Sequence, residues 1–283
     1  MPNPTLQRNP ATAIDLDAYF KRIRYEGERT PMLDTLRAIQ LKHTESIAFE
    51  NLNPLMGWPV PLDIESLQQK MVRDGRGGYC FEQNLLLKHE LEALGFRVTG
   101  LAARVLWNAP EGAVAPRSHM LLLVDLDGGR YVVDAGFGGV TLTGPLRLEA
   151  DIEQATPHEP FRLVKAEDEF IEQVKIGGHW VSLYRFNLSR QFLPDYEMAN
   201  WYLSTHPASR FVTGLLAARP APDRRYALLN NQLTVHYRNG GKDRRLITSL
   251  ADMRETLERD FRIVLPDVPE LDAVLARLIA KAD

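Results

Sequence analysis

The chain contains a single cysteine, Cys80, which lies in the stretch RGGYCFEQN, residues 76–84. Apolar residues recur at helical spacing directly after it, so we expect the thiol at the start of a helix. The free N–H groups and the dipole of a helix start favour the thiolate, which is the nucleophilic form of cysteine. A lone cysteine is also among the residue types most often buried for packing alone. Cys80 is therefore a candidate nucleophile only if a base can be found for it.

A predicted hairpin carries the best candidate base. Two apolar runs, residues 118–126 and 130–137, flank the dipeptide Asp127-Gly128. Asp-Gly between apolar runs is the strongest short-range signal for a two-residue hairpin turn. The two runs are therefore predicted to pair as antiparallel strands.

The register of this hairpin decides which side chains share a face. With a two-residue turn, His119 faces Gly136, and Asp134 lies one diagonal step from His119 on the same face. A three-residue turn would place the two on opposite faces. An imidazole oriented by a carboxylate is the base that a thiol nucleophile requires. Nothing in the spacing alone brings Cys80 to this pair.

The other histidines have no aspartate partner that can be placed by a comparable argument. We expect His43 and His89 at helix surfaces, and His158 and His179 in loops or at strand ends. The remaining two, His206 and His236, lie in the mixed C-terminal part. No H-E-x-x-H or H-x-x-x-H pattern is present, and one cysteine excludes both an internal disulfide and a cysteine-only metal site. We therefore expect no metal.

Helical patterns dominate the first ninety or so residues. Asp15 is a predicted N-cap, Thr30 and Pro31 occupy predicted cap and first-turn positions, and Gly95 is a predicted C-terminal stop. The predicted helices cover residues 15–23, 30–47, 62–72 and 80–95.

Short apolar and partly alternating runs follow, and these predict strands. They cover residues 97–107, 118–126, 130–137 and 145–150, and hairpin-like spacing continues over 161–187. Proline-containing stretches at 107–117 and 217–225 are interpreted as loops, the second as a possible domain boundary. Helices followed by strands and then a mixed end predict an α+β fold rather than alternating βαβ units.

The composition is that of a globular protein of 283 residues, with 45% hydrophobic and 25% charged residues and a net charge of −3. No basic block suggests nucleic acid, and no 18-residue apolar run suggests a membrane span. The N-terminal MPNPTLQRNP has no apolar core typical of a secretory signal. A free thiol is also kept reduced in the cytosol, so a cytoplasmic location is expected.

Several longer segments together identify a family. They are IAFENLN (47–53), RGGYCFEQN (76–84), LAARVLW (101–107), SHMLLLV (118–124), VDAGFGG (133–139), LTGPLRLE and NWYLSTHPAS. In this order, and over nearly the whole chain, they resemble the arylamine N-acetyltransferases. The absence of a long insertion after NWYLSTHPAS resembles the bacterial type.

The resemblance implies three domains: a helical bundle carrying the nucleophile (1–95), an antiparallel β-barrel carrying the base and its partner (96–200), and an α/β lid (201–283). It implies a Cys80–His119–Asp134 triad and a ping-pong reaction. Acetyl-CoA, as co-substrate, would acetylate the cysteine, and an arylamine, arylhydrazine or N-hydroxyarylamine would then take the acetyl group. It implies no metal, prosthetic group, nucleic-acid or membrane partner, and leaves monomer and homodimer open.

Further roles are carried over from the resemblance. The resemblance assigns the support of the cysteine loop to a buried polar set, Arg76, Glu50 and Asn53, and the lining of the acceptor pocket to Phe49, Val105 and Trp107. It places Ser118, Phe137 and Gly138 around the acetyl and pantetheine groups, and His236 on the lid at the CoA end.

Other functions use the same residues. A Cys–His–Asp hydrolase or transglutaminase-like enzyme would admit water or a protein amine to the acyl-enzyme. A member of the same family could instead close a macrolactam, a role that requires a polyketide gene cluster nearby. A non-enzymatic binding protein would have no need for all three of Cys80, His119 and Asp134.

Overall fold

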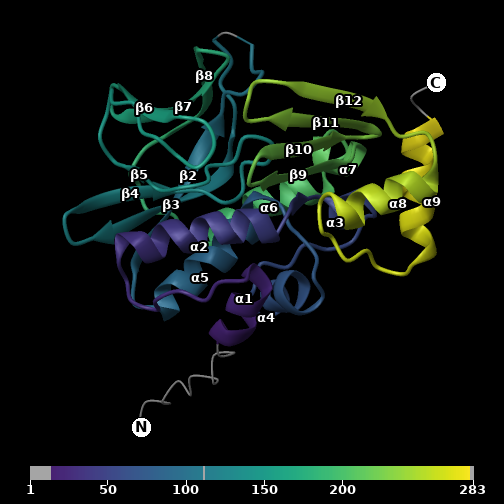
Figure 1. Ribbon diagram of the computed structural model, residues 1–283, viewed down its shortest axis with the longest axis horizontal. Helices are drawn as coiled ribbons and strands as arrows, with labels where there is room; N and C mark the ends of the chain where they lie inside the picture. The colour runs from purple at the N-terminus through teal and green to yellow at the C-terminus, as the bar shows by residue number, and fades with distance from the viewer. Residues whose placement is uncertain (1–13, 111, 281–283) are drawn as a thin grey trace, which may run out of the picture.

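The computed structural model describes residues 14–110 and 112–280, and it has the predicted α+β architecture. Helices from the first third of the chain pack against a curled seven-stranded sheet, and a second, five-stranded sheet with two C-terminal helices lies beside it (Figure 1). The N-terminal decapeptide considered for a secretory signal lies outside the described residues. Of the helices in residues 14–110 and 112–280, none is long and apolar enough to cross a membrane.

The N-terminal bundle contains the predicted helices, with one later start, a π-helical segment within the predicted helix 62–72, and one short helix that was not predicted. Asp15 caps the first helix by accepting from the Ala18 N–H at 3.0 Å, as predicted. The second helix does not begin at Thr30, because a turn closed by the Met32 N–H and the Thr30 carbonyl precedes it. The bundle comprises α1 (Leu16–Ile23), α2 (Leu33–Ser46), α3 (Leu52–Leu55), α4 (Ile64–Leu67) with the π-helical η1 (Gln68–Arg73), and α5 (Cys80–Ala93).

The seven-stranded antiparallel sheet has the order β5-β4-β3-β2-β8-β7-β6. Bridges from Ala150 to Leu163 and from Gln154 to Phe161 connect the segment after β5 to β6, so the two edges meet and the sheet forms a nearly closed barrel. Its strands are β2 (Arg97–Val105), β3 (Arg117–Leu126), β4 (Gly129–Val133), β5 (Leu146–Arg147), β6 (Phe161–Ala166), β7 (Glu169–Ile176) and β8 (His179–Phe186).

Strand β3 is buried on both faces. Met120, Leu122 and Val124 belong to the core shared with α5, whereas Leu121 and Leu123 belong to the barrel core. Side chains alternate along a strand, so His119 continues the face of Leu121 and Leu123. The strand thus contacts both the helical bundle and the barrel core, and it carries His119 of the candidate site.

The second sheet has the order β1-β9-β10-β11-β12 and is also antiparallel. Part of the stretch 217–225, predicted as a loop, forms a central strand, with Pro220 paired to Arg225; this prediction was wrong because the proline signal outweighed the apolar spacing around it. The elements are β1 (Phe49–Glu50), α6 (Leu193–Thr205), α7 (Arg210–Thr213), β9 (Leu216–Ala221), β10 (Arg224–Leu229), β11 (Gln232–Tyr237), β12 (Lys242–Leu246), α8 (Leu250–Arg259) and α9 (Pro269–Ala280).

Candidate active site

Cys80 is the first residue of α5, as predicted, and is only 4% exposed. Its thiol lies 3.7 Å from the carbonyl oxygen of Ser118, the residue before His119. The loop after β4 approaches so closely that a Cβ on Gly136 would lie 2.7 Å from the Cα of Cys80. A glycine at this position therefore lets the barrel touch the start of the cysteine helix.

The predicted hairpin geometry is confirmed. Leu126 pairs with Gly129, which makes the turn the two residues between them. His119 Nε2 lies 2.6 Å from Asp134 Oδ2, and both side chains are buried. Because Nε2 faces the carboxylate, Nδ1 is the nitrogen left for the thiol, and the proximity of Cys80 helps to raise the pKa of the imidazole. The structure thus brings Cys80 to the pair that the sequence had placed on one face.

The charges of this cluster support one another. Burial alone would lower the pKa of His119, but the Asp134 carboxylate and the hydrogen bonds to Asp134 and Cys80 raise it to about 10. Burial alone would raise the pKa of Asp134, but the charge of His119 and the hydrogen bonds that Asp134 accepts lower it. An imidazolium can therefore persist at neutral pH, where it stabilises a neighbouring thiolate.

Asn84, one turn after the cysteine on α5, binds the Asp134 carboxylate and the backbone next to His119 and next to Asp134. Its Nδ2 donates to Asp134 Oδ1 at 2.9 Å and to the Met120 carbonyl at 2.8 Å, and its Oδ1 accepts from the Ala135 N–H at 3.0 Å. This role of Asn84 was not predicted from the sequence. The i, i+4 spacing from Cys80, which puts both on one helix face, was the available signal.

A second buried carboxyl lies behind the imidazole and was also missed. The ring of Tyr184 lies 4.9 Å from that of His119, and its hydroxyl donates to Glu172 Oε2 at 2.8 Å. Burial, and then the charge of Asp134, raise the pKa of Glu172 to about 8. The carboxyl faces the barrel interior next to a register shift in β7, a position that no short motif indicates.

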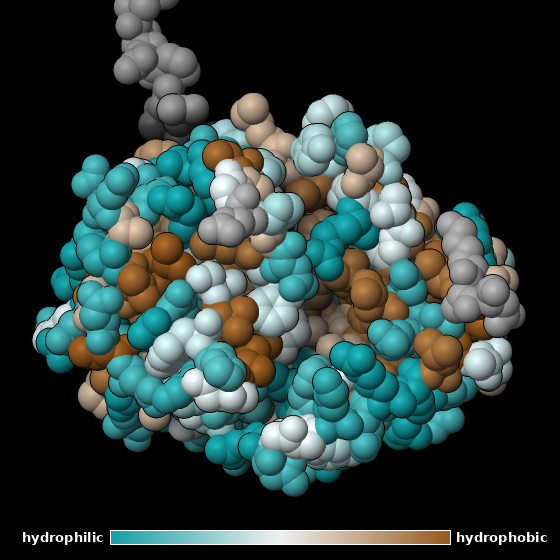
Figure 2. All heavy atoms as spheres, turned by 90° about the horizontal axis from the view of Figure 1, so that it is seen from above, coloured by the Kyte–Doolittle hydropathy of each residue, from teal (hydrophilic) through white to brown (hydrophobic). Residues whose placement is uncertain are grey.

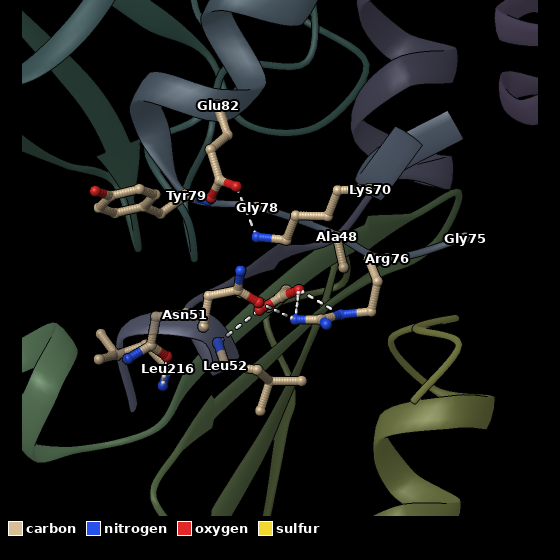
Figure 3. Close-up of polar contacts among 12 residues, drawn as sticks. Ala48, Asn51, Leu52, Lys70, Gly75, Arg76, Gly78, Tyr79, Glu82 and Leu216 are labelled. Atoms are coloured by element: carbon tan, nitrogen blue, oxygen red, sulfur yellow. Dashed lines mark hydrogen bonds and ion pairs between the residues drawn. The ribbon is translucent and has the colours of Figure 1, made fainter. Parts of the chain in front are cut away.

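The predicted supporting set also comes together, on the other side of the cysteine loop (Figure 3). Arg76 donates to Glu50 Oε1 through Nε and Nη2 at 3.0 and 2.8 Å, and to Asn53 Oδ1 at 3.0 Å. Glu50 is fully buried and also accepts from the Leu52 N–H at 2.6 Å. Burial would raise the pKa of Glu50, but the Arg76 charge lowers it. A Cβ on Gly77 would overlap the Ala48 carbonyl oxygen and lie 2.8 Å from Glu50 Cγ, so glycine leaves room for the backbone at Ala48 as well as for Glu50.

Of the predicted pocket residues, Phe137 lies against the His119 ring and Phe49 against the turn at Gly138. Phe137 packs edge-on to the His119 ring at 5.3 Å, and Phe49 lies within 3.8 Å of a Cβ built on Gly138. Val105 pairs with Tyr184 across β2 and β8, and the Trp107 N–H donates to the Leu183 carbonyl. Apolar side chains surround a hollow on the face seen in Figure 2.

His236 is the most peripheral of the predicted residues. It is exposed on β11, opposite Arg225 on one neighbouring strand and Lys242 on the other. Partial burial and the charges of Lys242 and Arg244 lower its pKa.

The expectation that His43 lies at a helix surface was wrong. His43 is fully buried, with its ring nitrogens 2.8 Å from the Tyr19 hydroxyl and 2.7 Å from Gln83 Oε1. Burial lowers its pKa to about 4, so it is a neutral link between α1, α2 and α5. In residues 14–110 and 112–280, no three His, Cys, Asp or Glu side chains gather as metal ligands.

Comparisons with known proteins find similar sequences over most of the chain. A family model described as N-acetyltransferase matches residues 32–269. Arylamine N-acetyltransferases of Mycobacterium tuberculosis and Escherichia coli are 44% and 40% identical over 270 and 268 residues, covering 94% and 92% of this chain and 95% of each relative.

Solved structures agree with this match. The arylamine N-acetyltransferase of Mycobacterium marinum superposes with a TM-score of 0.90 at 43% identity, covering 94% of this chain and 100% of that one. A structure of the same M. marinum enzyme in complex with CoA superposes equally well, with 93% and 99% covered.

Proposed function

The chain belongs to the arylamine N-acetyltransferase family, and we propose that it transfers the acetyl group of acetyl-CoA to arylamines, arylhydrazines or N-hydroxyarylamines through an acetyl-Cys80 intermediate. One observation carries the proposal for the intermediate. The only thiol of the chain lies at a helix start, beside an imidazole that Asp134 holds at 2.6 Å. The CoA complex of the M. marinum relative supports acetyl-CoA as the donor.

In the first half of the reaction, the Cys80 thiolate attacks the thioester carbonyl of acetyl-CoA. The new bond joins the carbonyl carbon to Sγ, and the bond from that carbon to the CoA sulfur breaks. The proton on Nδ1 of His119 passes to the leaving CoA thiolate, which departs as the thiol. Asp134 holds the ring through Nε2, so that Nδ1 stays directed at the sulfur.

In the second half, the nitrogen of the acceptor attacks the acetyl carbon of acetyl-Cys80. The C–N bond forms, the C–Sγ bond breaks, and a proton of the amine passes to Nδ1 of His119. The thiolate and imidazolium are thereby restored for the next cycle. Thioester exchange is nearly balanced in energy, and the acyl-enzyme remains reactive enough for a weakly basic aromatic amine.

The neighbouring residues suit a flat, apolar acceptor. Phe137 stacks edge-on to the imidazole, and Phe49, Val105 and Trp107 are assigned to the walls of the acceptor pocket. Ser118 and Gly138 would flank the acetyl and pantetheine groups, and His236 would meet the CoA end from the lid.

The proposed division into bundle (1–95), barrel (96–200) and lid (201–283) gives each domain one task. The bundle brings the nucleophile, the barrel brings His119 and Asp134, and the lid closes the route to water. A reducing cytoplasm would keep Cys80 available for acetylation.

The intermediate can be trapped directly. Incubation with labelled acetyl-CoA and no acceptor should add one acetyl group to Cys80, located by mass spectrometry of the peptide, and an arylamine should then remove it. The Cys80→Ser variant should fold and take up no label on this peptide. Release of free CoA with Cys80 unmodified would contradict the ping-pong route.

A further inference from the structure

A second buried ion pair lies against the cysteine loop, on its bundle side. Lys70 Nζ lies 2.6 Å from Glu82 Oε1, with the two side chains 13% and 1% exposed. Glu82 Oε2 accepts from the Tyr79 N–H at 3.0 Å. Figure 3 shows Lys70 extending across the loop at Gly78 to reach this carboxylate. The carboxylate therefore binds both a cation and the backbone immediately before Cys80.

Glu82 stands in the first turn of the helix that begins at Cys80. A glutamate here commonly caps a helix by accepting from the N-cap backbone, and this requires no cation. Its negative charge, however, lies two residues after Cys80 in the same helical turn and opposes a thiolate there by Coulomb repulsion. The ammonium of Lys70 offsets that charge without removing the cap.

Lys70 contacts the loop at two points. Its carbonyl accepts from the Arg76 N–H at 3.0 Å, and its ammonium binds Glu82, so it spans the loop from the first residue of RGGYC to the helix. It lies in η1, a π-helical turn, and such turns are often found at functional sites.

The second glycine of the loop is explained by the same contact. A Cβ on Gly78 would lie 2.8 Å from Glu82 Cβ and 2.9 Å from Oε2. Gly77 leaves room for Glu50, and Gly78 leaves room for Glu82. The two glycines thus admit one buried carboxylate each, and each carboxylate has its own cation.

The charged groups around the start of α5 come from every side. The pair of His119 and Asp134 faces Cys80 from the barrel, and the pair of Arg76 and Glu50 lies behind the loop. Burial and the Glu50 charge raise the pKa of Glu82, whereas the Lys70 charge opposes this rise. The Lys70 charge thus counters the effect of burial on this carboxyl.

We propose that Lys70 is a positioning residue for the acetyl transfer: by pairing with Glu82 it sets the charge at the start of α5 and thereby the fraction of Cys80 present as thiolate. The inference rests on the proposed function in one respect: it takes the Cys80 thiolate to be the nucleophile of the acetyl transfer. The effect acts through Glu82 and the helix start rather than through contact with substrate.

The thiolate fraction is measured by the pH midpoint of Cys80 alkylation with iodoacetamide, and Cys80 is the only thiol of the chain. In the Lys70→Met variant, the unpaired Glu82 charge should move the midpoint up by roughly one pH unit, about tenfold less thiolate below it. Glu82→Gln keeps an acceptor for the Tyr79 N–H but no charge, so the midpoint should move down by a similar amount. The double variant should return to within about 0.3 units of the wild type.

Lys88→Met is the matched control, because Lys88 pairs with Glu92 on the exposed side of the same helix at 2.7 Å. It should leave the midpoint unchanged. Midpoints of Glu82→Gln and of the double variant both equal to the wild type would overturn the proposal, and Glu82→Gln keeps the test open even if Lys70→Met does not fold. Alkylation needs no acetyl donor, so failure here is distinct from failure to form acetyl-Cys80.

Discussion

Two of the buried ion pairs around the loop that carries Cys80 differ in one respect. On the barrel side, Asp134 pairs with a histidine; on the bundle side, Glu50 pairs with Arg76. Both carboxyls have lowered pKa values despite burial, because a cation lies against each. The imidazole can give up its proton, whereas a guanidinium keeps its charge at any pH of interest. The same burial is therefore suited to proton transfer on one side and to fixed support on the other.

The largest effect is expected from a substitution in the barrel-side cluster. In Asp134→Asn, the amide nitrogen can no longer accept from Nε2, and the Oδ1 position is already bound by the Asn84 amide and the Gly136 N–H. The ring should lose its orientation, and kcat/KM for arylamine acetylation should fall about 10³–10⁴-fold. Far-UV circular dichroism should be close to that of the wild type. Activity within threefold of the wild type would remove Asp134 from the proposed triad.

Breaking the bundle-side cluster should affect stability instead. Arg76→Met leaves Glu50 buried and unpaired, which should lower the free energy of unfolding by about 3–5 kcal/mol in urea titrations. The double variant Arg76→Met/Glu50→Gln should recover part of this loss. If Arg76→Met unfolds like the wild type, the pair is not a support for the loop.

Glu90, on the same helix, is a buried carboxyl with no hydrogen-bond partner among the described residues. Burial, and then the charge of Asp15, raise its pKa to about 8. A raised folded-state pKa stabilises the fold at low pH, and this contribution is lost as the pH rises towards 8. Glu90→Gln should therefore remove roughly 3 kcal/mol of the decline in unfolding free energy between pH 5.5 and 8.

Glu197→Gln, on the exposed face of α6, serves as the control for this pH dependence and should leave it unchanged. An equal decline in the Glu90→Gln variant and the wild type would show that Glu90 has an ordinary environment.

The smallest effects are expected from replacing the asparagine of each cluster, Asn53 on the bundle side and Asn84 on the barrel side. Asn53 donates to the Pro59 carbonyl and accepts from Arg76, so Asn53→Ala should lose about 1–2 kcal/mol of stability while the rate per folded molecule stays near that of the wild type. Asn84→Ala removes a donor from Asp134, so kcat should fall beyond any loss of stability. Equal kcat values in the two variants would argue that the clusters do not differ in role.

Local patterns predicted much of the fold and part of the site. The Asp-Gly turn determines the register of the β3–β4 hairpin, and the alternation of side chains then puts His119 and Asp134 on one face. Asp15 and Gly95 bound their helices as predicted, since caps and stops act within a few residues. The proline signal at 217–225 failed because a strand tolerates proline where its N–H is not needed.

The sequence by itself determined the helix start at Cys80, the hairpin, and the residue types that could form a triad, because each depends on neighbours along the chain. Only the tertiary structure decided that Cys80 meets His119, that Asn84 links the helix to Asp134, and that Gly77 and Gly78 each admit a buried carboxylate. Apart from Gly78 and Glu82, which are four residues apart, these contacts join residues dozens of positions apart, across the packing of α5 against β3 and of the loop against β1. Lys70, the cation that pairs with Glu82, is recognisable only once burial has made that charge require a partner.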